Sequence, residues 1–274
     1  MRDDHDQPHR WYTTNLVGVP APVLGGVAFQ AHPVRLSIAG ARASHGGLFS
    51  LLDRAGDAAE AREMFGHYMS LAFGLQPAEG CVAERRRWKV SYLKLLQGWG
   101  MDANGAAGAV LKGWVESRFG LVPSFHKAPL QRFPSPAWIG YLEEKAASRW
   151  HNNSIWQQLD LLYEFCQWML ARFALLPEAV GPHVRLWRGS TRVEEQLVRG
   201  TLRERHCVVR LNNLVSFARS REEAECFGDW VFETQVPLAK LLFVPGLVKA
   251  SLLQGEAEVI AIGGDHVVEA RYAL

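Results

Sequence analysis

Along the first 175 residues, apolar side chains recur every three or four positions, which is the spacing of amphipathic helices. The pattern predicts helices over 57–75, 83–96, 105–120 and 153–175. The last of these has the clearest apolar stripe, made of Ile155, Leu159, Leu162, Cys166, Leu170 and Phe173. A loop with four prolines, residues 122–136, separates the earlier helices from a last pair.

After residue 182 the pattern changes to short runs with alternating hydrophobicity, which predict strands. The expected strands are 183–189, 206–216, 229–236, 239–245, 257–264 and 267–272. Residues 263–266, Gly-Gly-Asp-His, predict a hairpin turn between the last two. One short helix is expected over 220–227, where Ser220 and Glu223 fit a capping box. Short connections favour an antiparallel sheet over alternating parallel units.

The two patterns together predict an α+β protein. We expect a mainly helical N-terminal lobe over 1–178, which offers a surface for docking a target or a regulator. A β-rich catalytic core over 179–274 should follow it, and the two should form one compact unit.

The composition narrows the class of protein. The chain has 274 residues, 48% of them hydrophobic, and its 30 Lys and Arg against 28 Asp and Glu give a formal charge of +2. That near balance argues against a nucleic-acid-binding surface. The longest apolar stretches, such as 238–248, are too short and too interrupted to cross a bilayer, and the polar, acidic start is no secretory signal. We therefore expect a cytoplasmic protein that neither inserts into a membrane nor binds nucleic acid.

Neither the cysteines nor the histidines show the spacing of a metal site. Cys81, Cys166, Cys207 and Cys226 stand far apart and form no Cys-x-x-Cys pair. Reduced thiols are therefore expected in preference to disulfides or zinc ligands. The ten histidines contain no His-Glu-x-x-His or similar pattern. No metal is expected.

Three short motifs in the β-rich half carry candidate chemistry. Arg188 and Gly189 end one predicted strand, and Ser216 ends the next, just before the short helix. Glu256 and Glu258 lie two positions apart at the start of a later strand, so their side chains point to the same side. Two like charges on one face cost energy unless a positive group approaches them. Taken alone, such a pair is typical of a solvated strand edge. The three motifs together, in this order, instead favour a functional site.

This order of motifs resembles the Arg–Ser–Glu class of mono-ADP-ribosyltransferases, in which Glu-x-Glu marks the members that modify arginine. Residues 11–29, 32–42 and the helical middle are further similar to the dinitrogenase reductase ADP-ribosyltransferase family, over essentially the whole chain. The resemblance implies an ADP-ribosyltransferase fold with NAD as co-substrate. Residues 24–29 lack the strand–helix context of a dinucleotide fingerprint, which agrees with a non-Rossmann NAD site.

The resemblance also implies roles for the motif residues. Arg188, Gly189, Ser216 and Phe217 would bind NAD, with the guanidinium on the pyrophosphate. Glu258 would stabilise the oxocarbenium-like sugar, and Glu256 would orient the acceptor arginine and accept its proton. The sequence departs from the commoner Ser-Thr-Ser, since Ser216 is followed by Phe and Ala. Trp187 is either a core residue or a flank of the nicotinamide.

The family further implies a target and a regulator. The target would be dinitrogenase reductase, the nitrogenase iron protein, which modification of one arginine inactivates. The regulator would be a PII signal-transduction protein. Two alternatives stay open: an arginine-specific transferase with another protein target, and a non-catalytic NAD-binding regulator. The basic run 85–89 is either a solvated helix face or a docking patch for an acidic partner.

Overall fold

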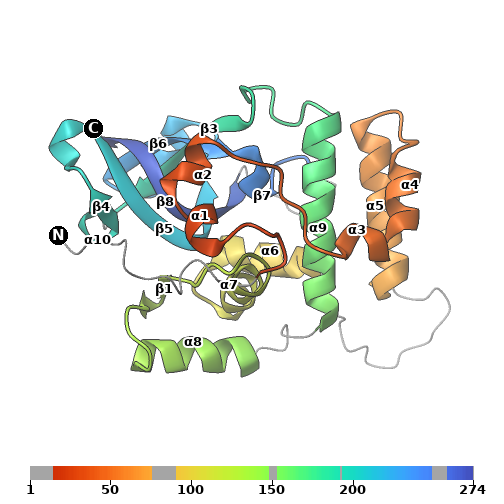
Figure 1. Cartoon of the computed structure of the whole chain (residues 1–274), viewed down its shortest axis with the longest axis horizontal. Helices are drawn as coiled ribbons and strands as arrows, with labels where there is room; N and C mark the ends of the chain where they lie inside the picture. The colour runs from red at the N-terminus through yellow and green to blue at the C-terminus, as the bar shows by residue number, and fades with distance from the viewer. Residues whose placement is uncertain (1–14, 76–90, 148–152, 192, 249–257, 274) are drawn as a thin grey trace.

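A computed structural model shows how the helical and strand patterns combine (Figure 1). It describes residues 15–75, 91–147, 153–191, 193–248 and 258–273. Helices fill most of the first part of the chain, and an antiparallel sheet fills most of the rest. The predicted α+β class is confirmed. The basic run 85–89 and Glu256 lie outside the described residues.

The first part contains nine of the helices that the structure describes. They are α1 (Ala21–Leu24), α2 (Val27–Ala31), α3 (Ala41–Ser44), α4 (Gly46–Leu52), α5 (Ala58–Phe73), α6 (Tyr92–Met101), α7 (Ala106–Phe119), α8 (Pro136–Ala147) and α9 (Asn153–Arg172). Three of the predicted helices, α5, α7 and α9, are confirmed. Of the helix predicted over 83–96, residues 83–90 lie outside the described residues, and α6 continues past residue 96 to Met101. The short helices α1 to α4 were not expected, because each is too brief to show a helical period.

The second part carries most of the strands. They are β3 (His183–Ser190), β4 (Leu197–Arg199), β5 (His206–Phe217), β6 (Trp230–Pro237), β7 (Leu241–Phe243) and β8 (Val259–Tyr272); the short β1 (Phe125–His126) and β2 (Ala128–Pro129) pair with each other in the earlier loop. Helix α10 (Val193–Gln196), helix α11 (Arg221–Glu225) and the 3-10 turns η3 (Leu202–Glu204) and η4 (Leu238–Lys240) connect the strands. In the capping box, Ser220 accepts from the Glu223 amide as predicted.

The sheet has the order β3-β6-β8-β5-β4, with β7 paired to β8, and all its described pairings are antiparallel. Strand β3 also reaches β5 directly, because Trp187 and Ala218 exchange two backbone hydrogen bonds of 3.0 and 2.7 Å. The end of β3 and the end of β5 are therefore neighbours, although two strands separate them in the sheet order.

The predicted hairpin turn at 263–266 is wrong, since β8 runs unbroken through these residues. The two glycines serve close approaches inside the sheet instead. A Cβ on Gly263 would come within 1.7 Å of the Asn212 carbonyl oxygen, at the bulge of β5. A Cβ on Gly264, which has a φ of +116°, would come within 2.5 Å of the Gly25 carbonyl oxygen. A glycine pair that predicts a turn also suits a strand crowded by other backbone.

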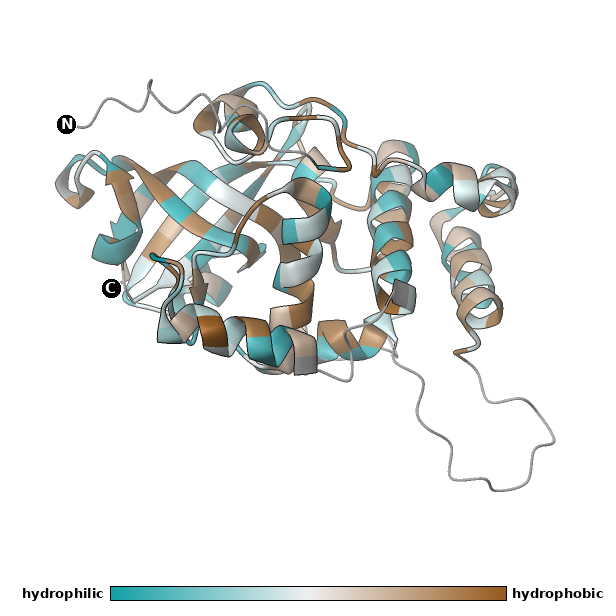
Figure 2. Ribbon diagram, turned by 60° about the horizontal axis from the view of Figure 1, so that its bottom comes forward, coloured by the Kyte–Doolittle hydropathy of each residue, from teal (hydrophilic) through white to brown (hydrophobic). Residues whose placement is uncertain are grey.

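The helices pack on the sheet through one hydrophobic core that includes residues of both parts. Helix α9 stands between the sheet and helices α3 to α5 (Figure 1). Two side chains of α9 donate hydrogen bonds to backbone carbonyls beside the sheet. The Tyr163 hydroxyl donates to the Ala239 carbonyl at 2.7 Å, and the Gln167 amide donates to the Leu241 carbonyl. Figure 2 shows hydrophobic and hydrophilic residues mixed along each helix, as expected for amphipathic elements. No helix among the described residues is long and apolar enough to cross a membrane.

One charged side chain of this core gives a stability prediction. Lys240 is fully buried and donates to the Gly263 carbonyl at 2.9 Å. Burial lowers the pKa of Lys240 to about 7, while the Asp265 carboxylate acts in the opposite direction. The pKa of His266, also buried there, is lowered by burial and by Lys240, so this imidazole is neutral in the folded protein above neutral pH.

Because the folded pKa of Lys240 lies below the unfolded one, the unfolded chain binds more protons between the two values. The free energy of unfolding should therefore rise with pH, by on the order of 1 to 2 kcal/mol between pH 7 and pH 8.5. Lys240→Met should remove this part of the rise. Urea unfolding of the wild type and of Lys240→Met at the two pH values measures the free energies of unfolding. An equal change with pH in the two proteins would contradict the prediction.

Candidate active site

Arg188 lies near the end of β3, opposite Phe232 of β6. Its Nη1 donates to the Ser216 carbonyl at 2.7 Å, which ties β3 to β5. The Nε is buried and has no hydrogen-bond partner among the described residues. Burial lowers the pKa of Arg188, and the carboxylate of Glu258 acts against that shift. A partly buried cation with an unused donor suits an anionic ligand.

Gly189 follows Arg188 and is required by the packing of α11. A Cβ at this position would lie 2.2 Å from the Ala224 carbonyl oxygen and 2.9 Å from the carbonyl carbon of Phe227. The backbone that comes close to Gly189 is therefore that of the short helix and its end. An NAD contact of Gly189 stays a prediction.

Ser216 is the last residue but one of β5 and is only partly buried. Its hydroxyl accepts a hydrogen bond of 2.8 Å from the indole Nε1–H of Trp99 on α6. Its carbonyl accepts from Arg188, as described above. Both the side chain and the main chain of Ser216 are thus held by residues far away in the sequence.

Phe217 and Trp187 have less access to the site than the sequence allowed. The Phe217 ring is 2% exposed and lies against the His266 ring with centroids 6.1 Å apart. Only its main chain is left to contact NAD. The Trp187 indole donates to Glu233 Oε2 at 3.2 Å, so its N–H is directed toward β6.

Glu258 lies immediately before β8, whose first residue Val259 pairs with Phe217 of β5. This register places Glu258 beside the end of β5, where Ser216 accepts from Arg188. The Glu258 carboxylate also raises the pKa of Arg188, against the effect of burial. The structure thus brings Arg188, Ser216 and Glu258 together at one end of the sheet. Glu256 belongs to the segment that the structure does not describe.

Trp99 was not predicted as a residue of this site. It is 117 positions from Ser216 and lies beyond the end of the helix predicted over 83–96, on the last turn of α6. No local signal distinguishes it from the other tryptophans. Pairing between distant helical and strand residues is visible only in the tertiary structure.

The site combines the Arg188 guanidinium, the Ser216 hydroxyl and the Glu258 carboxylate. The guanidinium matches phosphate oxygens, and the carboxylate can stabilise a developing positive charge on a sugar. Within the described ranges, no group of three His, Cys, Asp or Glu side chains is placed to hold a metal ion. The arrangement suits the cleavage of a nucleotide glycosidic bond by electrostatic stabilisation.

The three motifs that resemble the Arg–Ser–Glu class of ADP-ribosyltransferases thus lie at neighbouring strand ends of one antiparallel sheet. The sequence profile described as dinitrogenase reductase ADP-ribosyltransferase (DRAT) matches residues 14–270. This chain belongs to that family. It is 47% identical over 278 residues to the NAD(+)–dinitrogen-reductase ADP-D-ribosyltransferase of Rhodospirillum rubrum, covering 99% of this chain and 100% of the relative. No solved structure matches this chain significantly.

Proposed function

We propose that this chain transfers ADP-ribose from NAD to an arginine of dinitrogenase reductase, and thereby inactivates the nitrogenase iron protein. The proposal rests on the position of Arg188, Ser216 and Glu258 at neighbouring strand ends on one side of the sheet. The target comes from the Rhodospirillum rubrum relative, whose name states NAD and dinitrogen reductase as its substrates.

In the proposed reaction, the bond between the nicotinamide nitrogen and ribose C1′ breaks, and nicotinamide leaves with the electron pair. The oxocarbenium-like sugar is stabilised by the Glu258 carboxylate. A guanidinium nitrogen of the target then forms the new bond to C1′ and loses one proton. Glu256 is proposed to pair with that guanidinium and to accept the proton, because a guanidinium with a pKa above about 12 is otherwise a poor nucleophile.

Arg188 is proposed to hold the pyrophosphate of NAD. Its Nη1 donates to the Ser216 carbonyl, and its Nε has no hydrogen-bond partner among the described residues, so that donor would be left for a phosphate oxygen. Ser216 would hold either the nicotinamide ribose or Glu258. The family also suggests that a PII protein regulates the enzyme and that both work in the cytoplasm.

Arg188→Ala should weaken NAD binding by roughly 1.5 to 3 kcal/mol, the range for a lost charge-assisted hydrogen bond. Arg185→Ala is the matched control, since Arg185 lies on the same strand, is 57% exposed and pairs with Glu233. Calorimetric titration with NAD measures both. An unchanged Kd for Arg188→Ala would remove Arg188 from the NAD site.

The target is tested by incubating purified nitrogenase iron protein with this protein and NAD, followed by mass spectrometry. The expected result is a mass increase of one ADP-ribose unit on a single arginine peptide, with release of one nicotinamide. Nicotinamide release without labelling would point to another target. No release at all would favour the non-catalytic NAD-binding alternative.

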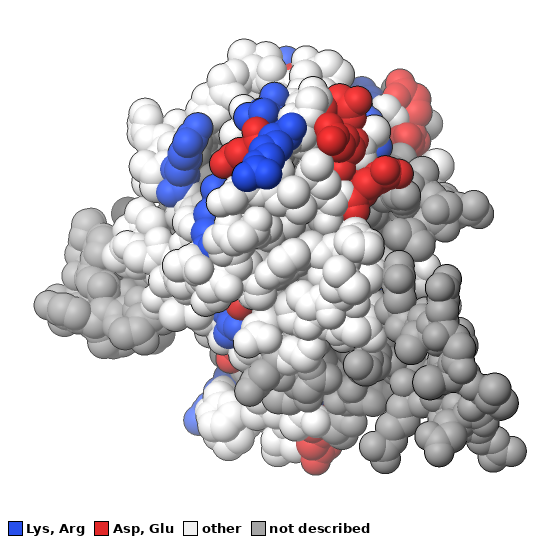
Figure 3. All heavy atoms as spheres, turned by 90° about the vertical axis from the view of Figure 1, so that its right-hand side faces the viewer, with Lys and Arg blue, Asp and Glu red and all other residues white. Residues whose placement is uncertain are grey.

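The helical part is the proposed surface for the target and the regulator. Figure 3 shows the face that carries α4 and α5, where acidic and basic side chains gather side by side at one end and uncharged residues cover much of the remainder. A face of mixed charge suits a protein partner with its own mixed charges.

A further inference from the structure

The hydrogen bond between Trp99 and Ser216 joins the helical part to the candidate site. Trp99 is 3% exposed, and its indole Nε1 lies 2.8 Å from Ser216 Oγ. An indole N–H only donates, whereas a hydroxyl has one proton and two lone pairs. The Ser216 oxygen is therefore the acceptor, and its own proton points away from Trp99.

The main chain of Ser216 is also held in place, by Arg188 of β3 and by its pairing with β8. Its carbonyl accepts from Arg188 Nη1 at 2.7 Å. It pairs with Ile260 of β8, two residues beyond Glu258. Because strand side chains alternate, Ser216, Ile260 and Glu258 lie on the same face of the sheet. The hydroxyl proton that Trp99 turns away is therefore on the face that carries Glu258.

Trp99 is held by close packing between α6 and α7. A Cβ on Gly98 would lie 2.7 Å from the Ala107 Cβ, so the two helices are in contact beside Trp99. The Lys112 Nζ lies 6.0 Å from the centroid of the Trp99 ring. Indole rings attract a cation over their face, which favours this orientation of Trp99.

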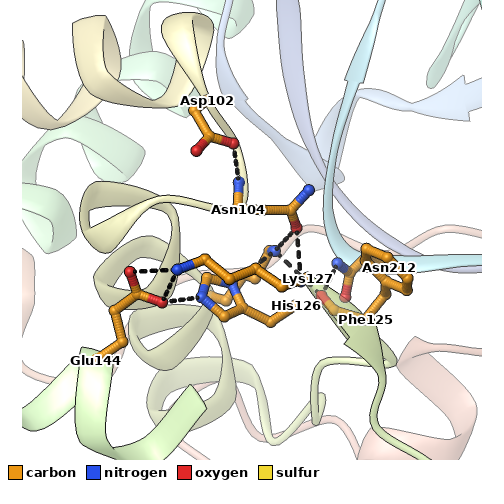
Figure 4. Close-up of polar contacts among 8 residues, drawn as sticks. Asp102, Asn104, Phe125, His126, Lys127, Glu144 and Asn212 are labelled. Carbon is orange, nitrogen blue, oxygen red and sulfur yellow. Dashed lines mark hydrogen bonds and ion pairs between the residues drawn. The ribbon is translucent and has the colours of Figure 1, made fainter. Parts of the chain in front are cut away.

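A polar network in turn holds Lys112, and Figure 4 shows Asn104, Phe125, His126 and Glu144 of that network. Lys112 is 1% exposed, and its Nζ donates to Asn104 Oδ1 and the Phe125 carbonyl at 3.1 Å, and to His126 Nδ1 at 3.2 Å. With Nδ1 accepting, His126 carries its proton on Nε2, which donates to Glu144 at 2.8 Å. A buried network with its polar groups paired is rigid.

The same network also holds the bulge of β5 that precedes Ser216. Asn213 Nδ2 donates to the carbonyls of Lys112 at 2.9 Å and Leu121 at 2.8 Å. Asn212 Nδ2 donates to the Phe125 carbonyl at 2.7 Å (Figure 4). The strand that ends in Ser216 is therefore positioned by helix α7 and the following loop before Trp99 contacts the side chain.

We propose that Trp99 is a positioning residue for ADP-ribose transfer, which orients the Ser216 hydroxyl as a hydrogen-bond donor toward Glu258 and the bound substrate. The helical part is then a component of the active site as well as a docking surface. This inference rests on the proposed function, because its assay measures the proposed ADP-ribose transfer.

The test is a double-mutant cycle with Trp99→Phe and Ser216→Ala, measured by nicotinamide release and by labelling of the iron protein. Trp99→Phe keeps an aromatic ring and removes the N–H. It should lower kcat for both activities about tenfold and leave the KM for NAD within about twofold, as expected for one lost hydrogen bond. In the Ser216→Ala background it should have no further effect, because the acceptor is gone.

Trp168→Phe is the matched control, since the Trp168 indole also donates to one side chain, Asp53, at 3.1 Å. Asp53 directly follows α4, which lies on the far side of α9 from the sheet (Figure 1). It should leave kcat unchanged. If Trp99→Phe unfolds, as judged by circular dichroism, benzothienylalanine at position 99 removes the N–H and keeps the ring shape.

Multiplicative losses in the cycle, or a Trp99→Phe kcat equal to that of Trp168→Phe, would overturn the inference. Wild-type nicotinamide release without labelling would reject the proposed target and still allow the cycle to decide the role of Trp99. A wild-type protein with neither activity would overturn the proposed function and this inference together.

Discussion

Glu258→Gln is expected to lower ADP-ribose transfer by about 100- to 1000-fold while the fold and NAD binding persist. The amide has nearly the same size as the carboxylate, but it carries no charge to face the oxocarbenium-like sugar. One preorganised contact of this kind is commonly worth roughly 3 to 4 kcal/mol in the activation barrier. Labelling of the iron protein under saturating NAD measures the rate.

Glu269→Gln is the matched control for this variant. Glu269 lies on the same strand as the residues that follow Glu258, and it pairs with Arg271 at 2.7 Å on the protein surface. Its amide variant should transfer ADP-ribose at the wild-type rate. Transfer by Glu258→Gln within tenfold of wild type would exclude Glu258 as the residue that stabilises the sugar cation.

Glu256→Gln is expected to abolish arginine labelling while slow hydrolysis of NAD to nicotinamide and ADP-ribose continues. The proposed partner of Glu256 is the cationic acceptor, whose orientation and deprotonation require a carboxylate. Water is small and neutral and needs no such partner, and Glu258 would still stabilise the sugar. Nicotinamide release and target labelling on the same variant measure the two activities.

The other outcomes for Glu256→Gln have distinct meanings. If both activities persist, Glu256 has no role toward the acceptor and belongs to a solvated strand edge. If both are lost with an unchanged circular dichroism spectrum, Glu256 supports Glu258 or NAD directly. Only a selective loss of labelling agrees with a role toward the acceptor arginine.

The sequence predicts the long helices well, and the short elements poorly. Helix α9 carries an apolar stripe over five turns, and Ile155, Leu159 and Leu162 along it are all fully buried. Helices such as α3, with four residues, are about one helical period long and leave no repeat to detect. The position of α3 depends on contacts with α9, including the ion pair of Arg42 with the buried Glu164.

The longer strands were also predictable, but strand continuity was not. Residues 259–262 form a short apolar run, and residues 266–271 alternate between buried and more exposed positions. The glycine pair predicts a turn when it is considered locally. In the folded protein, Asn212 and Gly25 approach the strand at this point, and only glycine leaves room for them. The glycines are explained by contacts with residues that are distant in the sequence, and a local pattern does not show those contacts.

By itself, the sequence determined the order of the motifs, the chemical types of Arg188, Ser216 and Glu258, and the division of the chain into helical and strand patterns. These depend on residue identity and on periods of two or of three to four residues, which are local properties. The tertiary structure alone decided that β3 reaches β5 beside Ala218 and that Trp99 donates to Ser216 across 117 positions. Such contacts arise because packing one shared core brings distant segments together, and no local period encodes which distant side chains then meet.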